Sequence, residues 1–389
     1  MSNRRRNREF KMSRPKYRFQ SRRARAALLW GLVMFSGLQL GLAIAIEYWL
    51  PELRDPNYAH RAALLRRRIG TESNRSLTVV MLGSSRTGVA LKGTLLDARL
   101  SRAIENPVIV FNFGLPGAGP VTELLNLKRL LADRVRPDLL LIEVLPPLLG
   151  GKDAVPWEAA WISSDRLWHG EIESLAPFGF ATRELRSTWW QAWPIPWYSH
   201  RFAILNLLAP GWLPWHLRQD WSRGTDDSGW TAHPEITPEF SRLATERARQ
   251  EYAVYLDGFR LGGPALRALQ GILYECQRAA IPAGLVLLPE GTAFQSWYPP
   301  GAWEQISAFL QNLSLQSGAP LINARSWLPD EDFSDSHHLL RRGAVKFSER
   351  LAQDALLPLL KRRKASATAS EFKARPLWDG HGSYRLTSK

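Results

Sequence analysis

Residues 26–46 contain no charged side chain, and this run constrains the whole chain. As an α-helix, about 20 apolar residues cross the ~30 Å hydrocarbon core of a bilayer. Eleven Lys and Arg lie within residues 1–25, which the positive-inside rule places in the cytoplasm. We therefore predict a basic cytoplasmic arm at residues 1–25, a single transmembrane anchor at residues 26–50, and a periplasmic or otherwise extracytoplasmic location for the remainder.

A cleaved signal peptide and a buried core helix are the alternatives to an anchor. Ala43-Ile44-Ala45 has the A-x-A form of a signal-peptidase site. The uncharged run, however, is longer than the usual hydrophobic region of a signal peptide, so an uncleaved anchor is favoured.

The basic charge of the chain is concentrated at its ends. The net charge is +15, but residues 1–25 and residues 361–389 hold nineteen of the Lys and Arg, and residues 26–360 are close to neutral. A neutral body offers no groove for a phosphate backbone, so nucleic acid is not expected as a partner. Cys276 is the only cysteine, which excludes an intrachain disulfide and a thiolate metal cluster. No metal and no cofactor are expected.

Strand-like and helix-like segments alternate after residue 76. Strands are expected at residues 77–83, 107–114, 137–145, 283–289 and 320–323, and helices at residues 91–104, 121–135, 240–256, 265–280, 302–316 and 342–360. Such alternation predicts right-handed crossovers and an α/β fold with a parallel sheet of about five strands.

A tryptophan-rich insertion interrupts this pattern at residues 147–238. Eleven of the seventeen tryptophans lie there: Trp157, Trp161, Trp168, Trp189, Trp190, Trp193, Trp197, Trp212, Trp215, Trp221 and Trp230. Prolines break any long helix, so short helices and loops are expected. The rings either form a platform for sugar or acyl groups, or fill a small core and enter the membrane interface; the second interpretation is favoured.

The remaining boundaries follow from composition. Residues 51–76 are polar and charged, and we interpret them as a stalk with a short helical piece at residues 62–69. The α/β domain then comprises residues 77–146 and residues 239–360, on either side of the insertion. Residues 361–389 are expected to form a basic, disordered tail.

Residues 77–86, LTVVMLGSSR, place Ser85 where the first strand passes into a helix. Strand ends in open α/β sheets border the ligand crevice, and a following helix presents free backbone N–H groups to negative charge. This position suits a nucleophilic hydroxyl. An ordinary serine-rich turn or helix N-cap is the alternative.

Asp335 and His338 lie between the last strand and the last helix, at the same sheet edge as Ser85 if all strands are parallel. A nucleophilic serine needs a base, and the base needs an orienting carboxylate. Asp335 can reach Nδ1 of His338 while Nε2 faces the serine, and His337 is expected to point away. A solvated helix N-cap with exposed histidines is the alternative.

Three segments resemble the conserved blocks of the SGNH (GDSL-type) hydrolases, in the family's order. They are Gly83-Ser84-Ser85, residues 112–117 (NFGLPG) and Asp335-x-x-His338, within a resemblance that covers about residues 77–351. The resemblance implies a flavodoxin-like, three-layer α/β/α sandwich. It also implies Ser85 as nucleophile, His338 as general base and acid, Asp335 as its orienter, and an oxyanion hole formed by the N–H groups of Ser85 and Gly117.

The run Asp-x-x-His-Leu-x-x-x-Gly-Ala at residues 335–344 looks like that of membrane-anchored, extracytoplasmic members of the superfamily. Those proteins accompany membrane-bound O-acyltransferases and modify cell-surface polysaccharides. The resemblance implies a serine esterase or O-acyltransferase that acts on acyl esters, with acetyl as the expected group, of such a polymer. Water and a sugar hydroxyl remain alternative acyl acceptors.

One block departs from the family. The third block, Gly-x-Asn-Asp, supplies an oxyanion-hole Asn, but here the third strand ends in Ile142-Glu-Val-Leu-Pro-Pro147. Losing one donor costs about 3 kcal/mol of transition-state stabilisation. Arg86, also predicted to bind substrate, or a group from the insertion is expected to replace it. The alternative is a weak or inactive scaffold that binds glycan or a membrane-bound O-acyltransferase.

Overall fold

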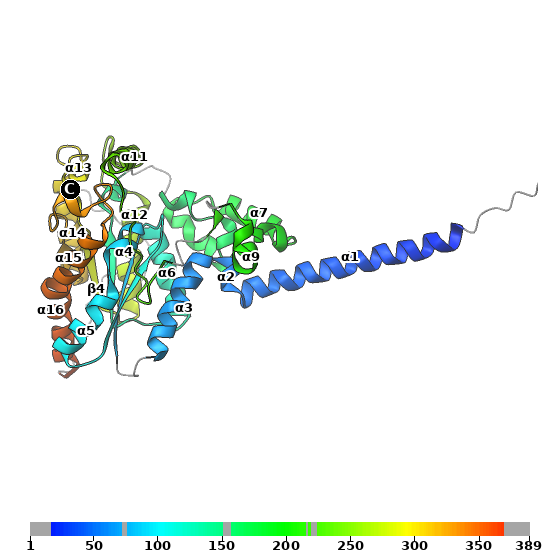
Figure 1. The fold of residues 1–389 in the computed structure, drawn as a ribbon, viewed down its shortest axis with the longest axis horizontal. Helices are drawn as coiled ribbons and strands as arrows, with labels where there is room; N and C mark the ends of the chain where they lie inside the picture. The colour runs from blue at the N-terminus through cyan, green and yellow to red at the C-terminus, as the bar shows by residue number, and fades with distance from the viewer. Residues whose placement is uncertain (1–16, 72–75, 151–156, 215–216, 219–223, 369–389) are drawn as a thin grey trace, which may run out of the picture.

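A long N-terminal helix projects from an α/β body in the computed structural model (Figure 1). The structure describes residues 17–71, 76–150, 157–214, 217–218 and 224–368. Helix α1 (Tyr17–Tyr48) carries the predicted anchor, and its segment Arg22–Tyr48 is long and apolar enough to cross a membrane. Most of the basic arm, residues 1–16, lies outside the described residues.

A five-stranded parallel sheet forms the centre of the body. Its strands are β1 (Leu77–Gly83), β2 (Val108–Gly114), β3 (Leu139–Val144), β4 (Ala283–Leu287) and β5 (Leu321–Asn323), in the order β2-β1-β3-β4-β5. All four pairings are parallel, as the sequence predicts. This is the flavodoxin-like order, in which ligands bind beyond the carboxyl ends of the strands.

Helices cover both faces of the sheet, so the predicted three-layer sandwich is confirmed. Successive side chains of β1 alternate between two cores: Val80 and Leu82 face one, Val79 and Met81 the other. The first core is covered by α6 (Pro120–Ala132), α12 (Gly263–Arg278) and α14 (Ala302–Ser317). The second is covered by α5 (Gly93–Ile104), α15 (Arg341–Leu351) and α16 (Leu357–Thr368).

Residues 51–71 are not an exposed stalk. They form α2 (Pro51–Arg54) and α3 (Pro56–Thr71), and Tyr58, Ala62 and Leu65 of α3 are buried in the first core. These three positions follow helical spacing and form one apolar stripe. Arg61 is buried beside it, while Arg66 and Arg67 are exposed. Residues 51–71 contain seven Asp, Glu, Lys or Arg side chains, so composition alone conceals the stripe.

The insertion consists of short elements, as its prolines predict. They are η1 (Pro146–Leu149), η2 (Trp157–Ala160), η3 (Ser164–Arg166), η4 (His169–Phe178), α7 (Thr182–Ala192), α8 (Pro196–Ser199), α9 (Arg201–Leu208) and η5 (Pro210–Trp212), before α11 (Pro238–Leu256). Leu175 and Trp189 are part of the first core. Among the insertion tryptophans whose burial is described, only Trp189 and Trp230 are buried, so the rings do not mainly fill a core.

The chain remains helical past residue 361, where a disordered tail was expected. After a π-helical turn at η8 (Ala352–Leu356), α16 continues to Thr368. Arg363 donates to the side chain of Asp138 at 2.6 Å, which holds this helix to the end of the sheet. Residues 369–389 lie outside the described part of the chain.

Candidate active site

Ser85 is the first residue of α4 (Ser85–Ala90), a short helix that begins directly after β1. The preceding Ser84 is the N-cap, and its hydroxyl accepts a hydrogen bond from the backbone N–H of Arg86 at 3.1 Å. The two interpretations of the serine pair, an N-cap and a candidate nucleophile, therefore apply to different residues. Ser84 caps the helix, and Ser85 presents a partly exposed hydroxyl at the carboxyl edge of the sheet.

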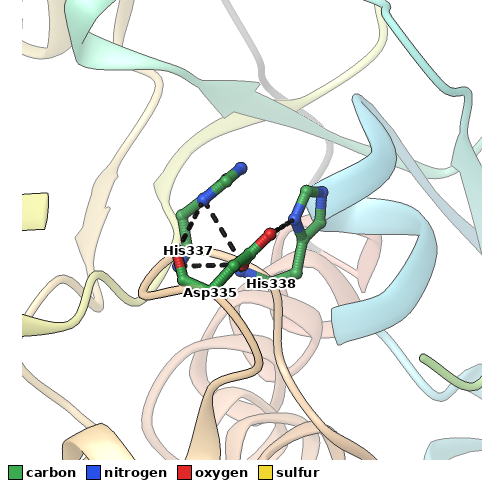
Figure 2. Close-up of side chains that lie close together, drawn as sticks. All are labelled: Asp335, His337 and His338. Atoms are coloured by element: carbon green, nitrogen blue, oxygen red, sulfur yellow. Dashed lines mark hydrogen bonds and ion pairs between the residues drawn. The ribbon is translucent and has the colours of Figure 1, made fainter. Parts of the chain in front are cut away.

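The structure brings Ser85, His338 and Asp335 together. Ser85 Oγ lies 2.8 Å from His338 Nε2, although 253 positions separate the two residues. His338 Nδ1 lies 2.8 Å from Asp335 Oδ2, as Figure 2 shows. Both distances are within hydrogen-bond reach, so a serine, an imidazole and a carboxylate are connected by two successive hydrogen bonds.

A tight loop holds Asp335 and His338 on the same side. Ser336 adopts a positive φ of 68°, which is uncommon for a residue other than glycine and turns the backbone sharply. The backbone N–H of Ser334 donates to the carbonyl of His338 at 2.9 Å, closing the loop. The N–H of His338 also donates to Asp335 Oδ1 at 2.8 Å, so one carboxylate fixes both the backbone and the ring of the histidine.

Asp335 is held in its charged form. Burial raises the pKa of its carboxyl group, but the neighbouring His338 and His337 and the hydrogen bonds from His338 outweigh this effect. The net pKa lies below the ordinary value for aspartate. The carboxylate therefore accepts a hydrogen bond from the Nδ1–H group of His338 at neutral pH, which leaves Nε2 free to accept the proton of Ser85.

His337 is buried against aromatic rings instead of contacting the serine. Its ring centroid lies 5.4 Å from that of Phe294 and 5.6 Å from that of Tyr252. Its Nδ1 lies 3.2 Å from the backbone carbonyl of Asp335. Burial, followed by the nearby His338, lowers the pKa of His337 to about 3, so the ring is neutral at physiological pH.

Asp335, His337 and His338 also form a group whose metal-ligating atoms lie within 4.8 Å of one another. Their bonding is already defined, however, because Nε2 and Nδ1 of His338 contact Ser85 and Asp335. A metal on His338 would replace one of these two hydrogen bonds. We therefore interpret these residues as part of the Ser85 site and not as metal ligands.

Arg86 does not face the site, so its predicted role in substrate binding is wrong. The side chain is 1% exposed and points inward, where Nη2 donates to the carbonyl of Pro289 at 3.0 Å. Its guanidinium lies 3.9 Å from Glu143 and 3.9 Å from Glu290. These two buried carboxylates draw the arginine away from the surface. It cannot replace the missing oxyanion donor either.

Glu143 is a residue of the site that sequence analysis missed. It lies on β3, and its Oε2 accepts from the backbone N–H of Ser84 and the hydroxyl of Thr87, each at 2.7 Å. Oε1 accepts from Ser84 Oγ at 3.1 Å. Glu143 thus ties the N-cap and first turn of α4 to the sheet. A carboxylate in the otherwise apolar strand Leu-Leu-Leu-Ile-Glu-Val was the available signal.

Gly83 is required by the same contacts. A Cβ atom at this position would lie 2.1 Å from Thr87 Oγ1 and 2.4 Å from Glu143 Oε2. Both atoms are held by their mutual hydrogen bond and cannot move apart without breaking it. Glycine therefore allows the chain to leave β1 close to Glu143 and turn into α4.

His233 is a second missed residue, and it comes from the end of the insertion. Its ring stacks on that of His338, with centroids 5.6 Å apart, and its Nε2 lies 3.4 Å from Ser334 Oγ. The pKa of His233 is lowered, mainly by burial. Trp230 holds this segment beside the serine by donating from Nε1 to the carbonyl of Val89 on α4 at 2.7 Å. A His-Pro pair in a loop carries no distinctive sequence signal.

Gly117 lies at the same sheet edge as Ser85. It follows β2 by three residues, and β1 and β2 are paired with Gly83 opposite Gly114. Gly117 has a φ of +70°, and a Cβ atom there would lie 2.3 Å from the Trp161 ring. After β3, by contrast, η1 begins with Pro146 and Pro147, neither of which has an N–H to donate.

The comparisons with known proteins concern parts of the chain. Residues 39–156 match a family described as "Protein of unknown function (DUF1574)", and no curated protein matches. A lipolytic G-D-S-L family protein from Desulfitobacterium hafniense is 11% identical, with a TM-score of 0.32, over 71% of this chain and 98% of its own. An acetylxylan esterase from Geobacillus stearothermophilus is 10% identical, with a TM-score of 0.33, over 72% and 94%.

A third similar structure is that of a gut microbial diltiazem-metabolizing enzyme, which is 12% identical with a TM-score of 0.34. The match includes 73% of this chain but only 48% of the length of that enzyme. The sheet has the flavodoxin-like strand order that the sequence predicts, and Ser85, His338 and Asp335 meet beyond its strands.

Proposed function

We propose that this chain is a membrane-anchored, extracytoplasmic serine esterase or O-acyltransferase. The observation that carries the proposal is the pair of 2.8 Å contacts from Ser85 Oγ to His338 Nε2 and from His338 Nδ1 to Asp335 Oδ2. A scaffold that only binds glycan or a partner protein has no need for this geometry. Catalysis is therefore favoured over the scaffold alternative.

The proposed reaction begins when His338 Nε2 takes the proton of Ser85 as its Oγ attacks an acyl carbonyl carbon. The resulting oxyanion is stabilised by the N–H groups of Ser85 and Gly117. Collapse of this intermediate expels the alcohol, which receives the proton from His338, and leaves an acyl group on Ser85. Water or a sugar hydroxyl then attacks the acyl-enzyme, with His338 again serving first as base and then as acid.

The proposed oxyanion hole has one donor fewer than the SGNH pattern. No Asn follows β3, and Arg86 is turned inward. Removing one such donor typically lowers kcat by about 10²–10³. We therefore expect slow turnover of simple esters.

The proposed substrate is an acyl ester, in particular an acetyl ester, of a cell-surface polysaccharide, and the proposed partner is a membrane-bound O-acyltransferase. The residues shared with the membrane-anchored branch support this choice. Trp161 also supports it, because its partly exposed ring lies against Gly117 and offers a flat face beside the proposed oxyanion hole. Sugar rings stack on such faces.

Intact-mass spectrometry tests the acyl-enzyme directly. After incubation with a chromogenic acetyl ester, the full chain should gain one acetyl group, and peptide mapping should locate it on Ser85. The variant Ser85→Ala should show no such adduct. A chain that releases acetate without a Ser85 adduct under rapid acid quench, or that never reacts, would count against the proposal.

Orientation in the membrane has its own test. With the basic arm inside, an alkaline phosphatase fused after Lys389 should be active, because this enzyme folds only where its disulfides form. A β-galactosidase fused at the same site should be inactive. The reverse pattern of activities would overturn the proposed topology and leave the Ser85 chemistry untouched.

A further inference from the structure

The insertion exposes an apolar surface that the proposed catalytic function does not use. We call it the aromatic collar and define it by the exposed side chains of Ile195, Trp197, Tyr198, Leu207, Leu208 and Trp212 on and beside α8, α9 and η5. Leu208 is 75% exposed and Trp212 is 83% exposed. Residues 195–214 include no acidic side chain, and Arg201 is the only Lys or Arg. A soluble surface of this composition is unusual.

The collar is attached to the anchor helix. Helix α8 packs against α1, and the N–H of Trp197 donates to the side chain of Gln39 at 3.5 Å. Ile46 of α1, Leu53 of α2 and Ile204 of α9 form a small buried cluster. Figure 1 shows α9 beside α1 at the end of the body from which the anchor projects.

Polar contacts fix the angle at which α1 leaves the body. Glu47 forms an ion pair with Arg54 at 2.5 Å, and its backbone carbonyl accepts from Trp168 Nε1 at 3.1 Å. His200 Nδ1 lies 2.9 Å from the carbonyl of Leu53. These contacts join the end of the anchor, α2 and the insertion into one unit. The collar therefore has a fixed orientation relative to α1, so the same side of it faces any membrane that α1 crosses.

The depth of the collar follows from helix geometry. Gln39 lies seven residues before Ile46, the last residue of the uncharged run, which at 1.5 Å per residue is about 10 Å. If residues 26–46 fill the ~30 Å hydrocarbon core, Gln39 lies inside it. The N-terminus of α8, which contacts Gln39, then lies at a similar depth, about 10 Å below the hydrocarbon boundary.

We infer that the aromatic collar is a second membrane contact, which reaches through the interface into the leaflet from which α1 emerges; this inference rests on the proposed anchor. Trp and Tyr side chains favour this interface, where their rings meet acyl chains and their polar atoms meet headgroups. Arg201 stacks on Tyr198 and Phe202, with its guanidinium carbon 4.1 and 4.3 Å from the ring centroids. Arg201 is the one cation within residues 195–214 that can pair with a lipid phosphate.

Spin labelling of the full chain in lipid nanodiscs tests the inference. Single cysteines are introduced as Leu208→Cys and Trp212→Cys in the collar, Leu32→Cys within α1, and Leu315→Cys on α14. Leu315 is a matched control because it is 83% exposed and α14 lies at the opposite end of the body (Figure 1). The native Cys276 is buried, and burial raises its pKa to about 12, so it should remain unlabelled. The unsubstituted chain measures that background.

The readout is the accessibility of each label to oxygen, which concentrates in lipid, relative to a water-soluble nickel complex. Labels at positions 32, 208 and 212 should favour oxygen several-fold more than the label at position 315. If position 32 favours oxygen while positions 208 and 212 resemble position 315, the collar inference fails and the anchor stands. If position 32 also resembles position 315, the anchor itself fails. Labels at positions 208 and 212 that neither agent reaches would indicate a protein contact and also overturn the inference.

Discussion

Ser85→Ala and His338→Ala are each expected to lower kcat for an acetyl ester by about 10³-fold or more, and the double variant should be no slower than either single variant. Ser85 Oγ and His338 Nε2 share one 2.8 Å contact, so removing either atom abolishes the same proton transfer. Neither change removes a main-chain hydrogen bond. Melting temperatures close to that of the native chain should accompany the loss of activity, which initial-rate kinetics in detergent would measure.

Asp335→Asn and His337→Asn separate the two histidines of the loop. Asn at position 335 favours the imidazole tautomer that carries its proton on Nε2, so kcat should fall by several orders of magnitude. His337 does not contact Ser85, and Asn at position 337 should cost far less in kcat. A larger loss from His337→Asn than from His338→Ala would mean that His337, and not His338, is the base.

Unchanged polysaccharide modification in cells carrying Ser85→Ala would favour the scaffold alternative.

The architecture was predictable because it depends on periodicity. Each strand of the sheet is a short apolar run bounded by turn residues, and the runs alternate with helical spacing. Parallel pairing then requires that β1 and β5 end at the same edge. The meeting of Ser85 with the loop at residues 335–338 follows from that constraint, even though the sequence separates them widely.

The incorrect predictions for Arg86 and for residues 56–71 concern contacts between segments that are distant in sequence. Periodicity identifies buried positions, but it does not say that two buried carboxylates draw Arg86 inward, or that residues 56–71 have a partner for their apolar stripe. His233 reaches His338 only because the end of the insertion crosses α4. These contacts join segments that are distant in sequence, and no local pattern encodes them.

Glu143→Leu is expected to destabilise the fold and to lower activity together. The change removes the acceptor of the Ser84 N–H and the Thr87 hydroxyl, and it takes one of two carboxylates from Arg86. Burial lowers the pKa of Arg86, but Glu143 and Glu290 raise it above the ordinary value, so the guanidinium stays charged. Removing one partner of a buried ion pair costs about 3–5 kcal/mol. The melting temperature should therefore fall by about 10 °C, at roughly 2–4 °C per kcal/mol.

Glu143→Gln distinguishes the hydrogen bonds of this carboxylate from its charge. The amide oxygen can still accept from the Ser84 N–H and the Thr87 hydroxyl, and its NH₂ group can donate to Ser84 Oγ, so α4 should keep its position. Stability should then fall less than in Glu143→Leu, while kcat should stay closer to that of the native chain. Glu304→Leu on the exposed first turn of α14 serves as the matched control and should change stability by less than about 0.5 kcal/mol. If Glu143→Leu instead melts with the native chain and turns over at its rate, α4 must be held by other contacts, and Glu143 does not position Ser85.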